Sequence, residues 1–66
     1  MNIILNGVPY NVAANTSIRA LLHTLELDIE KVAVERNMEI LPHSLYENTE
    51  IAEGDSLEIV HFIGGG

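Results

Sequence analysis

Residues 1–13, MNIILNGVPYNVA, hold two short apolar runs on either side of the dipeptide Asn6-Gly7. Asn-Gly readily adopts the positive φ angles of a type I′ turn, the tight turn that joins two antiparallel strands. Alternate residues of the first run share one face of a strand: Met1, Ile3 and Leu5. The stretch therefore predicts an N-terminal β-hairpin with one buried face. Pro9 lacks a backbone donor, which places it at a sheet edge or next to the turn.

The next segment, NTSIRALLHTLEL (residues 15–27), predicts a helix. Thr16 or Ser17 can cap its start. The apolar residues after the cap have helical spacing and form one stripe: Ile18, Leu21, Leu22 and Leu25. We expect an amphipathic helix of roughly three turns that lies across the apolar face of the hairpin.

The remaining residues predict strands with turns between them. KVAVERN (31–37) is rich in β-branched residues, and a turn at residues 37–39 leads into a short segment that Pro42 stops. Residues 42–51 are loop-like, with a single helical turn. After the turn at residues 53–55, a strand alternates between two faces: Leu57, Ile59 and His61 on one, and Glu58, Val60 and Phe62 on the other.

The element order is therefore β-β-α-β-β-β, which indicates an α+β protein. The crossover connection favours parallel pairing of the first and last strands in the centre of the sheet. This is the β-grasp arrangement of ubiquitin-like proteins, a mixed sheet of about four to five strands with one helix packed on one face. We expect residues 1–63 to form this domain and residues 64–66 to form a flexible glycine tail.

Composition limits the functions that the chain can have. Its 66 residues include ten acidic and three basic side chains, for a net charge of −7, and no cysteine. Nucleic-acid binding depends on clustered Lys and Arg, so it is disfavoured. The acidic surface would attract a basic protein partner, or would only keep a small domain soluble. The start MNIIL lacks the features of a signal peptide or a membrane span, so we expect a soluble cytoplasmic protein, monomeric when free.

The side chains offer little chemistry of their own. The three histidines, His23, His43 and His61, lie on different predicted elements without metal-ligand spacing, so no metal site is expected. Nucleotide-binding and nucleophile motifs are missing from the sequence, and a chain this short leaves little room for a substrate pocket. We therefore expect neither catalytic residues nor a bound cofactor.

The chain's last three residues, Gly64, Gly65 and Gly66, suggest chemistry at the terminus instead. In extended form they reach about 10 Å, and without side chains they can enter a narrow channel. The carboxylate of Gly66 could attack the α-phosphorus of ATP on a partner enzyme and form an acyl-adenylate. A sulfur nucleophile would then give a thiocarboxylate, and an amine would give a protein conjugate. The alternative is an inert, frayed end.

The whole chain resembles the ThiS family of sulfur carrier proteins. The resemblance rests on MNIILNG, TSIRALLHTLEL, KVAVERN with ILP, EGDSLEIV and the final HFIGGG. It implies that an E1-like adenylyltransferase activates Gly66 with ATP, that a desulfurase system supplies sulfur, and that thiazole synthase receives it in thiamine biosynthesis. Gly65 would let the tail pass. The chain departs from the family pattern at Met38, where a hairpin glycine would be comfortable, and at Pro42-His43.

The last strand also predicts a docking face for the partner enzymes. If Leu57 and Ile59 point into the core, the outward side chains beside the tail are free to bind a partner. We expect this face to comprise Ile4, Glu58, Val60, Phe62 and Ile63. The alternative for Phe62 is that its ring folds back over the sheet.

Three other functions remain open from the sequence. A molybdopterin-type sulfur carrier shares the fold and the glycine end, although such chains are usually longer and often have a proline shortly before the glycines. A ubiquitin-like modifier would join Gly66 to lysines of target proteins. A plain interaction module would have no use for its tail.

Overall fold

The computed structural model describes residues 1–62, so Ile63 and the glycines 64–66 lie outside the described residues. The elements appear in the predicted order. Five strands and one helix are found: β1 (Asn2–Leu5), β2 (Val8–Asn11), α1 (Ile18–Thr24), β3 (Val32–Arg36), β4 (Glu39–Leu41) and β5 (Ser56–His61). Two short 3₁₀ turns, Ile29–Lys31 and His43–Leu45, precede and follow the β3–β4 hairpin.

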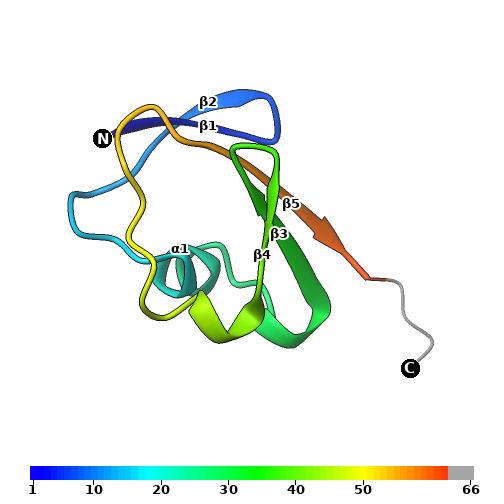
Figure 1. The fold of residues 1–66 in the computed structure, drawn as a ribbon. Coiled ribbons are helices and arrows are strands. Elements are labelled where there is room, and N and C mark those ends of the chain that lie inside the picture. Colours follow the sequence, from blue (N-terminus) through cyan, green and yellow to red (C-terminus); the bar gives the residue numbers. More distant parts are fainter. Residues whose placement is uncertain (63–66) are drawn as a thin grey trace.

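The strands form one mixed sheet in the order β2-β1-β5-β3-β4. β1 and β5 pair in parallel, while β5 and β3 are antiparallel, so the predicted parallel pair in the sheet centre is confirmed. Figure 1 shows α1 on one side of this sheet and β5 running between the hairpin β1–β2 and strand β3. Pro9 lies on β2, an edge strand, as its missing donor predicted.

The helix is shorter than predicted. It begins at Ile18, where the side chain of Ser17 accepts a hydrogen bond of 3.0 Å from the Ala20 N–H, and ends at Thr24 after about two turns instead of three. The cause is Glu26, whose φ of 59° is left-handed. There the Glu26 N–H donates to the His23 carbonyl and the Leu27 N–H to the Leu22 carbonyl, the pattern that closes a helix.

The core forms between the helix and the inner face of the sheet. The predicted apolar stripe is confirmed, since Ile18, Leu21 and Leu22 are buried and Leu25 packs against them partly covered. Tyr46 was not predicted as a core residue because its sequence surroundings are loop-like. Its buried hydroxyl accepts a 3.0 Å hydrogen bond from the Val34 N–H of β3.

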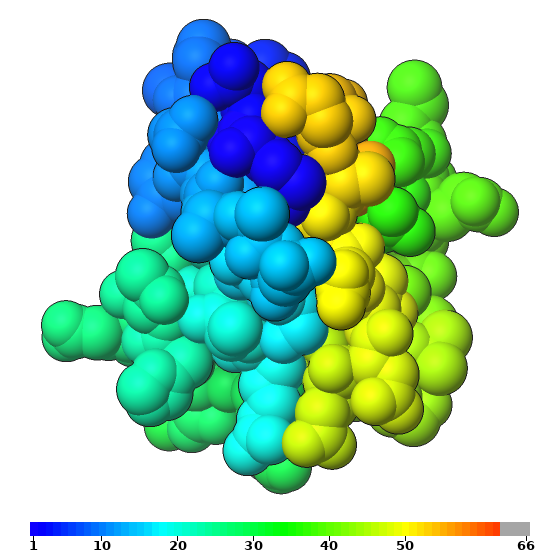
Figure 2. Space-filling view, turned by 90° about the vertical axis from the view of Figure 1, so that its left-hand side faces the viewer, coloured from blue at the N-terminus to red at the C-terminus, as the bar shows by residue number. Residues whose placement is uncertain are grey.

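Residues 46–55 cross the molecule before β5 begins. Figure 2 shows this segment, in yellow, beside the blue N-terminal residues and the cyan residues that lead into α1. Backbone hydrogen bonds join it to both: the Gly54 N–H donates to the Asn2 carbonyl at 2.8 Å, and the Ile18 N–H to the Thr49 carbonyl at 2.9 Å. The loop therefore holds the start of β5 against β1.

Candidate functional site

β5 alternates between the two faces of the sheet as predicted. Leu57 is fully buried under the helix, whereas Glu58 is exposed on the opposite, outer face. Farther along that face, Val60 is 55% exposed and Phe62 is 51% exposed. Half of the Phe62 surface is therefore open at the point where the described residues end. Ile63, the other predicted docking residue on this side, lies outside the described residues.

Ile4 lies on the same outer face but away from Phe62. The strand register places Ile4 level with Ser56, at the beginning of β5. Val60 lies four residues farther along, about 13 Å at the usual rise of a strand. The sheet therefore does not bring Ile4 next to the apolar end of β5, and Glu58 separates the two parts of the predicted docking face.

The outer face also carries residues that the sequence prediction missed. Glu35 of β3 lies directly opposite Glu58, and Ile40 of β4 lies opposite Glu35. Ile40 is 77% exposed. Neither glutamate belongs to an ion pair within residues 1–62, where the ion pairs are Arg19–Glu47 and Arg36–Asp55. The β3–β4 hairpin brings Ile40 opposite Glu35, but only the long-range pairing of β3 with β5 places both beside Glu58, so no local pattern could have shown the whole group.

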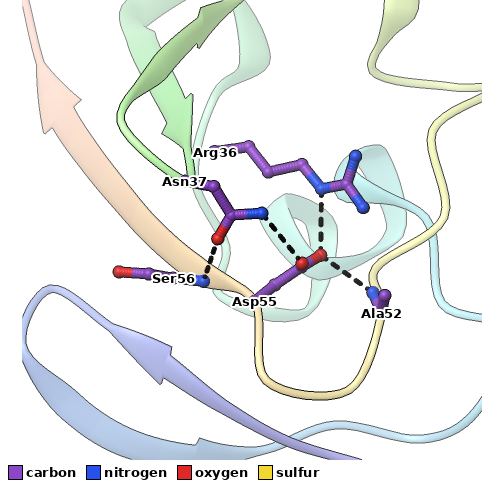
Figure 3. A network of polar contacts seen from close by, with 5 residues as sticks. All are labelled: Arg36, Asn37, Ala52, Asp55 and Ser56. Carbon is purple, nitrogen blue, oxygen red and sulfur yellow. Dashed lines mark hydrogen bonds and ion pairs between the residues drawn. The ribbon is translucent and has the colours of Figure 1, made fainter.

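A polar network around the buried Asp55 fixes the beginning of β5, and Figure 3 shows its five residues. The Asp55 carboxylate accepts hydrogen bonds from Arg36 Nε at 2.9 Å, Asn37 Nδ2 at 3.1 Å and the Ala52 N–H at 2.8 Å. The Asn37 side chain also accepts from the Ser56 N–H at 2.9 Å. The turn between β3 and β4 is thus tied to the residue that starts β5.

Asp55 remains ionised in this network despite its burial. Burial by itself raises the pKa of a carboxyl group, but the hydrogen bonds from Ala52, Asn37 and Arg36, with the positive charge of Arg36, outweigh it and lower the pKa of Asp55 below its ordinary value of 3.8. A buried aspartate within a predicted turn gave no separate signal in the sequence.

The far end of β5 pairs with the beginning of β3, and one more backbone bond joins it to the residue just before β3. The Phe62 N–H donates to the Lys31 carbonyl at 2.8 Å. The predicted reactive and tail residues Gly64, Gly65 and Gly66 follow and lie outside the described residues. What the described residues provide is a strand in the centre of the sheet that leads directly to them.

Residues 1–62 hold neither a candidate metal site nor a helix that could span a membrane. No group of three or more His, Asp or Glu side chains in this part of the chain could hold a metal ion. None of its helices has the length and apolar character needed to cross a membrane.

Comparison with known proteins extends these observations to the family. The sulfur carrier protein ThiS of Bacillus subtilis (strain 168) is 41% identical over 63 residues, which cover 94% of this chain and 96% of that protein. The crystal structure of the thiamine biosynthesis protein ThiS from Geobacter metallireducens matches with a TM-score of 0.86 at 36% identity, covering 100% of both chains.

A longer relative contains the same segment. A thiazole synthase of Paramagnetospirillum magneticum (strain ATCC 700264 / AMB-1) is 50% identical over 66 residues, which are 100% of this chain and 20% of that protein. The chain thus spans about a fifth of that relative. The family model described as "ThiS family" matches residues 3–66. With nearly all of its residues matched and its fold shared, this chain belongs to the ThiS family.

Proposed function

We propose that this chain is a sulfur carrier of thiamine biosynthesis and that Gly66 carries the sulfur as a thiocarboxylate. The observation that carries the proposal is family membership over residues 3–66, which includes the glycine residues. The fold supports it, because β5 leads from the sheet centre to a terminus made only of glycine. In this role the chain is a co-substrate of other enzymes and not a catalyst.

The proposed reaction proceeds in two steps on a partner enzyme. A Gly66 carboxylate oxygen attacks the α-phosphorus of ATP, pyrophosphate leaves, and an acyl-adenylate forms. A sulfur nucleophile supplied by a desulfurase system then attacks the carbonyl carbon. The C–O bond to AMP breaks, and AMP leaves with the bonding electrons. If the nucleophile is sulfide, Gly66 then ends in a thiocarboxylate. If it is a persulfide on the donor, an acyl disulfide forms first, and a second thiol attacks the donor's sulfur, breaks the S–S bond, forms a disulfide with the donor and releases the thiocarboxylate.

The acceptor in this proposal is a thiazole synthase. In the Paramagnetospirillum magneticum relative, a segment similar to this whole chain is part of a protein described as thiazole synthase. Joining two proteins in one chain raises the effective concentration of each near the other, which benefits partners that must exchange a group. This supports a thiazole synthase as the protein to which the sulfur is delivered.

The test is a loading reaction followed by intact-mass measurement. The purified chain is incubated with an E1-like adenylating enzyme, ATP and sulfide, with a chain lacking Gly65 and Gly66 as the control. We expect one oxygen to be replaced by sulfur in the full chain and no change in the control. An unchanged mass of the full chain would contradict the proposal, and adducts with lysine side chains would favour a protein modifier instead.

We also propose that the exposed end of β5 docks on the adenylating enzyme. Val60 and Phe62 present apolar surface beside the tail, and exposed apolar side chains at such positions commonly anchor an interface. Val60→Asp should lower the loading rate about tenfold or more, because a charge would be desolvated in the interface. The matched control is Val8→Asp, at a valine of similar exposure on the edge strand β2, which should load normally. Equal loading of the two variants would place docking elsewhere.

A further inference from the structure

The two sides of β5 differ in how their backbone groups are bonded. On the β3 side, the Ser56 carbonyl accepts from Asn37 at 2.8 Å, and the Phe62 N–H donates to Lys31 at 2.8 Å. In an antiparallel pair the bonding direction alternates from residue to residue, so the even-numbered residues of β5 bond to β3. The odd-numbered residues therefore direct their N–H and C=O groups toward β1.

On the β1 side, the ladder ends before β5 does. The Leu57 carbonyl accepts from the Asn6 N–H at 2.8 Å, just after β1 ends at Leu5. The Asn6 side chain then extends the ladder by one residue, since its Oδ1 accepts from the Ile59 N–H at 2.7 Å and its Nδ2 donates to the Ile59 carbonyl at 3.4 Å. Figure 1 shows β5 continuing past the end of the hairpin β1–β2.

His61 is the next odd-numbered residue of β5, so its backbone N–H and C=O groups also point toward the β1 side. Within residues 1–62, no group bonds to its backbone N–H or C=O on the β1 side, where the pairing ends at Leu57 and the Asn6 amide serves Ile59. Such an open stretch of strand is a template for pairing with another chain. It lies between Val60 and Phe62, whose side chains are exposed on the outer face.

We propose that His61 is a β-augmentation point, where one extended strand of the adenylating enzyme pairs with the open edge of β5. The inference rests on the proposed function and adds how the tail is aligned. In this mode the main chain supplies the hydrogen bonds and neighbouring side chains supply specificity. The His61 N–H donates to the partner strand and the His61 carbonyl accepts from it. Gly66 follows His61 by five residues, so the chain can extend at most about 17 Å from this pairing point to Gly66.

The charge of the chain indicates the character of that strand. The net charge is −7, and Glu58 and Glu35 are exposed along the same outer face. A strand with Lys or Arg beside its apolar residues is complementary to this surface. A second copy of the chain could also pair at the edge, but it would bring another seven negative charges and is disfavoured.

The test separates the backbone of residue 61 from its side chain. His61→Pro removes the N–H, and because that N–H takes no part in the β3 ladder, the variant should fold. His61→Ala removes the side chain and keeps the N–H. Both variants should give the wild-type pattern of NMR signals for α1 and β3. In the loading reaction, His61→Pro should be about tenfold slower than His61→Ala, which should match the wild type.

Amide hydrogen exchange of the wild-type chain gives a second readout that needs no substitution. The His61 amide should exchange rapidly in the free chain and about tenfold more slowly with the adenylating enzyme bound, whereas the Phe62 amide should be protected in both states. Equal loading of the two variants, or unchanged His61 exchange, would overturn the proposal. So would a concentration-dependent dimer that His61→Pro abolishes. If no enzyme loads the wild-type chain, the proposed function fails first and this inference with it.

Discussion

Met38 occupies a backbone conformation that suits glycine. The two hairpin turns have nearly the same φ angles, 51° and 81° at Asn6-Gly7 and 51° and 72° at Asn37-Met38. A side chain in the left-handed region brings its Cβ close to the following carbonyl oxygen, which costs free energy. The resemblance to the family had already marked Met38 as a place where a hairpin glycine would be comfortable, and the positive φ confirms it.

Met38→Gly should therefore stabilise the protein. The side chain is 90% exposed, so its removal gives up little packing. Relief of the strained conformation should raise the free energy of unfolding by about 0.5–1 kcal/mol, after the greater freedom of glycine in the unfolded chain is subtracted. Urea denaturation measures the change. Met38→Ala is the control and should show no such gain, since it keeps the Cβ.

Asp55 should make stability depend on pH. Its pKa is lowered in the folded protein, because the hydrogen bonds from Ala52, Asn37 and Arg36 outweigh the opposing effect of burial. The folded state therefore releases this proton at lower pH than the unfolded chain. The resulting stabilisation is complete above the ordinary pKa of 3.8 and is lost as the pH falls through the folded-state value.

Asp55→Asn tests this account. The variant should lose about 2 kcal/mol at pH 7, because an amide cannot replace the carboxylate as the ionic partner of Arg36. As the pH is lowered from about 5 to about 3, the free energy of unfolding of the variant should also fall less steeply than that of the wild type, because the variant lacks the carboxyl group that takes up a proton. Urea denaturation across this range gives both quantities. Parallel pH profiles of the two proteins would show that Asp55 is not the group responsible.

At the scale of the element, α1 depends on its ends. A helix of seven residues has few internal hydrogen bonds, so its capping contacts are a large part of its stability. Ser17→Ala removes the acceptor for the Ala20 N–H and should cost about 1 kcal/mol in thermal or urea unfolding. Ser17→Asp should retain most of the stability, since it offers another acceptor. Equal losses in both variants would assign the effect to packing.

The sequence predicted the elements well because local patterns set them. The dipeptide Asn6-Gly7 indicates a hairpin without help from distant residues. In the same way, the apolar stripe that begins at Ile18 indicates a helix, and the alternation along β5 indicates a strand. The helix length was wrong because Glu26 gives no sign of ending a helix, whereas a glycine there would have. Three tertiary features were missed: buried Tyr46, the network around Asp55 and the open edge at His61 all depend on which strands become neighbours.

At the scale of the whole molecule, charge should control encounter with partner enzymes. A chain with a net charge of −7 is attracted to a basic surface over a distance that salt shortens. The association rate with the adenylating enzyme should therefore fall as NaCl is raised from about 0.05 M to about 0.5 M. Stopped-flow mixing measures this rate. A rate that does not change with salt would leave the acidic surface only a role in solubility.

The central claim is that Gly66 is the group on which this molecule carries sulfur. The fold, the exposed end of β5 and the family all support it, and the most direct measurement is the intact mass of the chain after loading. The account predicts that one oxygen at the C-terminus is replaced by sulfur, and that tandem fragmentation assigns the change to Gly66. A chain that forms the adenylate but never gains sulfur, or gains it at another residue, would contradict the claim.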